Sequence, residues 1–135
     1  MENKYALIIE EHPGIGLLIS EHLKDLKEKP KKIYRANNYQ EAEKKINKLN
    51  FLGLDYFVLA CSEVWDGNKK NPTSNLLENI TPKTHAVMYS SGINKEAEKK
   101  LVNKKVHYAK LSSSEIGDFD NFCRTLFQAG IIKNN

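Results

Sequence analysis

The apolar and polar positions divide the chain into five short apolar runs, each followed by a segment with helical spacing. The first run, from Ala6 to Ile9, contains no polar alternation, and neither does the run that follows Asp55. Continuous apolar runs of this length predict strands that are buried on both faces, as in a parallel sheet. The pattern predicts strands at 4–9, 32–36, 55–61, 85–89 and 106–109.

Apolar residues recur at helical spacing after each predicted strand. Pro13 and Asn38 stand where a first-turn proline and an N-cap residue would begin the first two helices. The segment 62–71 is polar and predicts a loop. The helical positions expected in the core are Ile15, Leu18, Ile19, Leu23 and Leu26, then Ala42, Ile46 and Leu49, then Leu76, Leu77 and Ile80, then Ala97, Leu101 and Val102, and in a last helix Ile116 to Phe127.

Five consecutive β-α units predict an α/β fold of the flavodoxin-like type. This is a doubly wound sheet of five parallel strands in the order 2-1-3-4-5, with helices on both faces. Such sheets bind their ligands at the carboxyl ends of the strands, in the crevice beside the first and third strands. Glu10 and Glu11 directly follow the first predicted strand, so any site is expected beside them.

Length and composition indicate one domain spanning residues 1–135. A chain of 135 residues can bury a core without disulfide or metal support. No apolar run approaches the roughly 18 residues of a membrane span, and the N-terminus lacks the apolar core of a secretory signal. The two cysteines, Cys61 and Cys123, fit neither a disulfide framework nor a zinc motif. We therefore expect a cytoplasmic protein with reduced thiols and no membrane partner.

The net charge of +4 comes almost entirely from lysine, because Arg35 and Arg124 are the two arginines of the chain. Sites that read nucleic acid favour arginine forks and interleaved aromatic residues. The lysines instead alternate with Glu and Asn along predicted helix surfaces. This pattern predicts solvated helix faces and no direct nucleic-acid binding.

Three motifs at strand ends resemble the receiver domain of two-component response regulators, and the resemblance covers almost the whole chain. They are Ala-Leu-Ile-Ile-Glu-Glu-His-Pro at 6–13, Ser90 after the fourth strand and Lys110 after the fifth. The His-Pro pair is similar to regulators of the NarL/LuxR type. In that family an acidic pair helps to bind Mg²⁺, and an aspartate at the end of the third strand accepts a phosphoryl group. The Ser/Thr and the Lys then hold the phosphoryl oxygens.

The acceptor position is where this sequence departs from the family. The family's pattern begins at Asp55, and the residue five positions later is Ala60. A methyl group can neither accept a phosphoryl group nor bind a metal. The resemblance therefore implies a degenerate phosphorylation pocket formed by Glu10, Glu11, Ala60, Ser90 and Lys110. In it, Lys110 is expected to pair with Glu10 or Glu11.

Cofactor binding is not expected, because two carboxylates offer few ligands to Mg²⁺, which sheds its water reluctantly. A weak divalent-ion site at Glu10 and Glu11 is the alternative. Three nearby residues are candidate substitute acceptors. Cys61 and Ser62 adjoin Ala60, but a shift of one residue along a strand turns the side chain to the other face. Asp66 falls in the expected loop, far from Lys110.

The resemblance also implies a switch position and a contact surface. His107 stands three residues before Lys110, at the family's aromatic switch position, which Tyr108 would fill in another register. The family's fourth helix, fifth strand and fifth helix form a surface for dimerisation or for a partner protein. In this chain that surface would include Lys99 and Val102. A DNA-binding effector domain, where one exists, lies outside this chain.

The sequence thus predicts a non-enzymatic pseudo-receiver that acts through protein–protein contact independently of aspartate phosphorylation. One alternative is a working phosphorelay receiver with an unorthodox acceptor. Another is a different flavodoxin-like module that binds a nucleotide or flavin. The turn Glu-Glu-His-Pro at 10–13 disfavours the latter, because two acids repel phosphate where a glycine-rich cradle would bind it.

Overall fold

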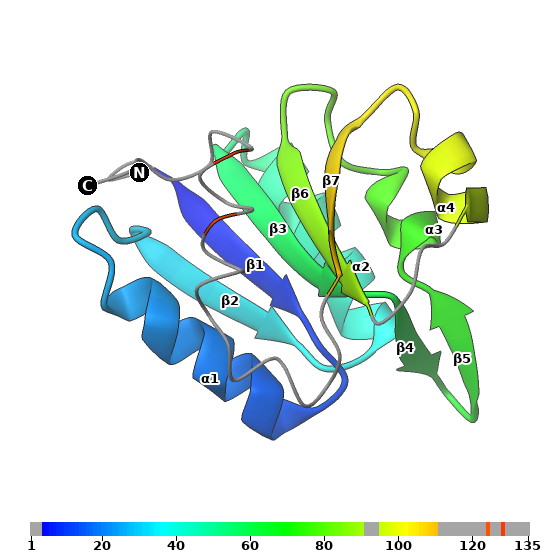
Figure 1. The fold of residues 1–135 in the computed structure, drawn as a ribbon, viewed down its shortest axis with the longest axis horizontal. Helices are drawn as coiled ribbons and strands as arrows, with labels where there is room; N and C mark the ends of the chain where they lie inside the picture. Colours follow the sequence, from blue (N-terminus) through cyan, green and yellow to red (C-terminus); the bar gives the residue numbers. More distant parts are fainter. Residues whose placement is uncertain (1–3, 91–94, 111–123, 125–127, 129–135) are drawn as a thin grey trace.

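A computed structural model describes residues 4–90, 95–110, 124 and 128, and Figure 1 shows their arrangement. The main sheet has five parallel strands in the order β2-β1-β3-β6-β7. Counted within this sheet, the order is 2-1-3-4-5, which confirms the predicted flavodoxin-like topology. The strands are β1 (Tyr5–Ile9), β2 (Lys32–Ala36), β3 (Tyr56–Cys61), β6 (His85–Ser90) and β7 (Lys105–Lys110).

Helices pack on both faces of this sheet. On one face, α1 (Pro13–Lys24) buries Ile19 and Leu23 against alternate residues of the strands, including Ile8 and Phe57. The opposite face carries α2, α3 and α4, whose bounds are Tyr39–Phe51, Ser74–Leu77 and Lys95–Lys100. Because successive strand residues point to opposite faces, β1 and β3 need apolar side chains at every position, which explains their unbroken apolar runs.

The segment predicted as a polar loop is instead a β-hairpin. Its strands, β4 (Glu63–Asp66) and β5 (Lys69–Pro72), pair antiparallel beside the main sheet, as Figure 1 shows. Gly67 opens the two-residue turn with φ +66°, a conformation that glycine adopts without strain. The Gly-Asn pair at 67–68 is the available hairpin signal, but the surrounding strands are too polar to stand out.

Two predicted core positions are wrong. Leu18 is 42% exposed, because α1 turns Gly16, Ile19, Ser20 and Leu23 towards the sheet. A Cβ at position 16 would meet Glu10 and Arg35 side-chain carbons at 3.8–3.9 Å, so this face of α1 lies close to the end of β1. Val102 is 75% exposed, because α4 ends at Lys100 and the chain then turns away.

Core predictions are confirmed for α2, for α3 and for the turn after α3, where Ala42, Ile46, Leu49, Leu76, Leu77 and Ile80 are all buried. The predicted last helix falls mainly outside the described residues. Of its length, Arg124 and Gln128 are described, and both are helical and exposed. None of the helices within the described residues is long and apolar enough to span a membrane.

Asn38 begins α2 as the sequence predicts. Its side-chain Oδ1 accepts a hydrogen bond from the backbone N–H of Glu41 at 2.9 Å. The Glu41 carboxylate reaches back and accepts one from the backbone N–H of Asn37 at 3.0 Å. Two amide donors at the start of the helix are thereby satisfied.

Replacement of Asn38 by Ala is expected to lower the free energy of unfolding by about 1 kcal/mol, because the amide of Glu41 loses its acceptor. Urea denaturation followed by circular dichroism measures the change. Asn47→Ala, at an exposed position within α2, is the matched control and should have little effect or be slightly stabilising. Equal loss in both variants would contradict the capping role.

Candidate functional site

The strand register brings the five predicted pocket positions to one edge of the sheet. Ile9 pairs with Ala60, so Glu10 and Glu11 leave β1 beside the end of β3. Ser90 pairs with Lys110 at the ends of β6 and β7. The backbone positions of these five residues therefore lie at the same edge of the sheet. The side chains of Ser90 and Lys110 lie outside the described residues, and so does the predicted pairing of Lys110 with either glutamate.

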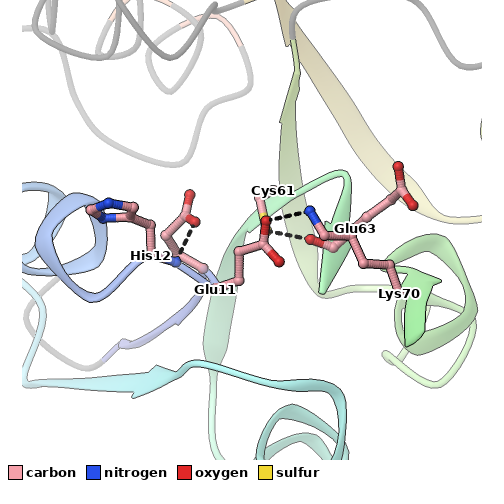
Figure 2. Close-up of polar contacts among 6 residues, drawn as sticks. Glu11, His12, Cys61, Glu63 and Lys70 are labelled. Carbon is pink, nitrogen blue, oxygen red and sulfur yellow. Dashed lines mark hydrogen bonds and ion pairs between the residues drawn. The ribbon is translucent and has the colours of Figure 1, made fainter. Parts of the chain in front are cut away.

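Glu10 is a buried carboxylate with both oxygens hydrogen-bonded. It is 5% exposed. Its Oε1 accepts a 2.7 Å bond from the Tyr89 hydroxyl, and its Oε2 accepts a 2.9 Å bond from the backbone N–H of His12. Figure 2 shows the second bond. Because a buried ionised carboxylate is costly without such donors, these two bonds allow a charge to sit at the end of β1.

Tyr89 is the partner that sequence reasoning missed. Burial, and then the charge of Glu10, hold the pKa of its phenol well above the ordinary value, so the hydroxyl stays a donor. The available sequence signal for Tyr89 is its position directly before Ser90. In the structure it pairs with Cys61 across the strand ends. A tyrosine at the carboxyl end of an apolar strand is ambiguous, however, because it fits a core position equally well.

Glu11 forms an ion pair with Lys70 of the hairpin. The Lys70 Nζ lies 2.9 Å from Glu11 Oε1 (Figure 2). The hydrogen bond to Glu11 raises the pKa of Lys70. The same ammonium lies 5.3 Å from the ring centroid of Trp65, its cross-strand neighbour. The hairpin thus brings a cation to the acidic pair, a role that the loop prediction could not anticipate.

The acceptor position is an alanine, which has no reactive group. Two of the three candidate substitute acceptors, Cys61 and Asp66, interact with other residues. Ala60 is fully buried in the layer beneath α2 and α3. Burial raises the pKa of the Cys61 thiol to about 12, and its Sγ lies 3.2 Å from the Glu63 carbonyl oxygen. Asp66 accepts a 2.7 Å bond from the Asn71 amide inside the hairpin. Ser62 is half-buried.

The described residues do not fit a bound Mg²⁺. Both oxygens of Glu10 already accept hydrogen bonds, Glu11 Oε1 is paired with an ammonium, and Ala60 offers no ligand. Glu11 Oε2 is buried and has no hydrogen-bond partner among the described residues. One free carboxylate oxygen provides too few ligands for Mg²⁺, which prefers octahedral coordination. Nowhere in 4–90, 95–110, 124 and 128 do three or more potential ligands gather as a metal site would need.

His107, at the predicted switch position, pairs with a second histidine. The His107 Nε2 lies 3.2 Å from His85 Nδ1, and the two rings stack with centroids 5.4 Å apart. Burial, and then the charges of His107 and Lys105, lower the pKa of His85; burial lowers that of His107. Tyr108, on the other face of β7, is 40% exposed.

Solved structures with this fold include receiver domains of signalling proteins. A signal receiver domain of an HD domain-containing protein from Pseudomonas fluorescens Pf-5 has a TM-score of 0.60 at 15% identity, covering 97% of this chain and 92% of that one. The Salmonella typhimurium response regulator RcsB has a TM-score of 0.63 at 15% identity, covering 96% of this chain and 62% of RcsB. A putative pilus assembly-related protein from Burkholderia pseudomallei has 0.57 at 11%, covering 93% and 91%.

No family model and no curated protein matches the sequence. Identities this low establish the fold alone. The chain has the fold of response regulator receiver domains, as the motifs at 6–13, Ser90 and Lys110 predicted.

Tyr89→Phe is expected to lower the free energy of unfolding by about 1–3 kcal/mol, because the buried Glu10 carboxylate loses a donor while the ring is kept. Chemical denaturation measures the loss. Tyr108→Phe removes a hydroxyl from an exposed tyrosine and serves as the control, with a change within about 0.5 kcal/mol. A neutral Tyr89→Phe variant would show that the carboxylate does not depend on this bond.

The His85–His107 pair should make the fold less stable in mild acid. Both pKa values are lowered in the folded state, so below about pH 6.5 the unfolded chain binds more protons than the folded one. Stability is therefore full above that pH and falls as the pH drops through the two folded-state pKa values. Thermal unfolding of wild type and His85→Gln across this window tests it. The variant should lose less stability on acidification, and parallel profiles would refute the role of the pair.

Proposed function

We propose that this chain is a degenerate receiver domain that signals through protein–protein contact without phosphorylation of an aspartate. The observation that carries the proposal is Ala60, a fully buried methyl group in register with the residue that precedes Glu10. Phosphoryl transfer to a protein needs a nucleophile with its charge neutralised in place. This position supplies no nucleophile, although the acidic pair beside it persists.

The partners of the acidic pair support the same proposal. In a working receiver two such carboxylates would help to hold Mg²⁺. Here Tyr89 and the His12 amide satisfy Glu10, and Lys70 neutralises Glu11. We propose that these contacts replace the metal and that the domain needs no cofactor. The pocket then serves to fix the ends of β1, β3 and β6 and the hairpin in one arrangement.

We propose the surface of α4 and β7, continued by the predicted last helix, as the contact site for a partner protein or a second copy. Val102 is 75% exposed, Tyr108 is 40% exposed, and Lys99 is an exposed residue of α4. An exposed aliphatic and an exposed aromatic residue suit a protein contact, because the core of such an interface is apolar. We further propose a non-enzymatic role in the cytoplasm, with any sequence-specific DNA-binding effector domain residing outside residues 1–135.

A phosphodonor experiment tests the proposal. The protein is incubated with acetyl phosphate and Mg²⁺, and its intact mass is measured by mass spectrometry. We expect no added phosphoryl group, because the residue at the acceptor position is an alanine. A receiver that retains its aspartate acceptor, treated in parallel, verifies the donor.

A stoichiometric gain of one phosphoryl group on the wild-type chain would overturn the proposal and favour an unorthodox acceptor. Asp66→Asn and Ser62→Ala, treated in the same way, would then identify it by loss of the added mass. Both positions lie outside the main sheet, so the fold should tolerate the two substitutions.

A further inference from the structure

One segment carries a large share of the positive charge of the chain. Residues 24–48 contain nine Lys and Arg against four Asp and Glu, a net charge of +5, whereas the whole chain carries +4. The segment runs from the end of α1 through the edge strand β2 and along α2. Folding therefore gathers a net positive charge at the β2 edge. Residues 95–110, with six Lys against two Glu, form a second basic stretch on α4 and β7.

The centre of this surface is Tyr34 on β2. Three ammonium groups surround its ring, those of Lys32, Lys45 and Lys48, at 4.8, 5.5 and 5.9 Å from the centroid. The ring of Tyr5 stacks against it at 6.2 Å, and Lys31 lies 5.9 Å from the Tyr5 centroid. The attraction of each cation to the ring faces offsets part of the repulsion between the ammonium groups.

Two hollows flank this cluster, one on either side of β2. The first, of about 260 Å³, is lined by four cations and one acid: Arg35, Lys44, Lys45, Lys48 and Glu41. Glu41 is engaged at the start of α2 by the Asn37 amide. The second, of about 370 Å³, carries Lys24, Lys29, Lys31, Lys32 and Arg35. Within the described part of the chain, none of the three lysines around Tyr34 forms an ion pair with a carboxylate.

We propose that this basic edge, formed by β2 and the facing side of α2, binds the phosphate backbone of a nucleic acid without reading its sequence. Unneutralised cations held close together release their counterions when a polyanion replaces them. Lysine serves phosphate well as a point charge, and a strip with two hollows suits an extended chain of phosphates better than a single small anion.

This inference revises the sequence-based expectation of no direct nucleic-acid binding. The scarcity of arginine counts against the recognition of base edges. The lysines around Tyr34 cover its ring, so the ring is not free to stack on a base. Neither feature opposes contact with the phosphate backbone. An acidic protein is the competing ligand. Carboxylates are bound best by arginine forks, and this surface has one arginine, Arg35, beside its lysines. The inference does not depend on the function proposed above.

Fluorescence anisotropy with a labelled oligothymidylate tests the proposal on the full chain. Wild type should bind at low salt, with log K falling by about 0.7 per phosphate contact for each tenfold rise in salt. Lys44→Glu with Lys48→Glu, both at exposed positions of α2, should weaken binding at least tenfold and flatten this slope. Lys44→Gln with Lys48→Gln should act in the same direction with a smaller loss, and circular dichroism verifies that α2 remains folded.

The matched control is Lys83→Glu with Lys95→Glu, two exposed lysines away from the β2 edge. It makes the same change in net charge and should retain most of the affinity. Equal loss in the control would mean that only net charge matters, and the proposal would fail. It would also fail if wild type did not bind the oligonucleotide at low salt. Displacement of the oligonucleotide by polyglutamate at equal charge concentration would reject it in favour of an acidic protein.

Discussion

The hydrogen bonds to the buried Glu10 carboxylate are the constraint on which the site depends. A charge at the end of a central strand is unfavourable unless both oxygens find donors. One donor comes from the turn into α1, at His12, and the other from β6, at Tyr89. The carboxylate thereby connects the first strand to a strand two places away in the sheet. Removing this pair of donors would leave a buried charge that nothing else in the described pocket compensates.

This constraint explains why the acidic pair can persist beside an alanine. A carboxylate at position 60 would add a third negative charge beside the acidic pair, and three such charges need a cation between them. With Ala60 there are two carboxylates, and the chain supplies donors to one and an ammonium to the other. The Glu11–Lys70 pair is partly exposed, so its own contribution to stability is small. The ion pair instead holds the β4–β5 hairpin against the carboxyl edge of the sheet.

Local features of the fold were predictable from the sequence, whereas the long-range contacts between the residues of the site were not. The unbroken apolar run of β3 and the Asn38 cap are determined by neighbouring residues, and both were predicted. Tyr89 reaches Glu10 across 79 positions, and Lys70 reaches Glu11 across 59. No local pattern encodes such contacts. The helical spacing of Leu18 predicts a core position, but α1 turns Gly16, Ile19, Ser20 and Leu23 towards the sheet instead. Ser90 and Lys110 were found by resemblance, and the register of β6 and β7 brings their backbones together.

The two proposed surfaces lie at opposite edges of the sheet, since β2 and β7 are its outer strands. A ligand alters a distant surface only if it binds two conformations with different affinity. In a receiver, phosphorylation at the central crevice would provide that difference. If the contacts of Glu10 and Glu11 hold the strand ends in one arrangement, as proposed, binding at the β2 edge and binding at the β7 edge would be independent in free energy. Under the two proposals, such a module would bring two partners together by holding both at once, and its output would depend on their concentrations and its own.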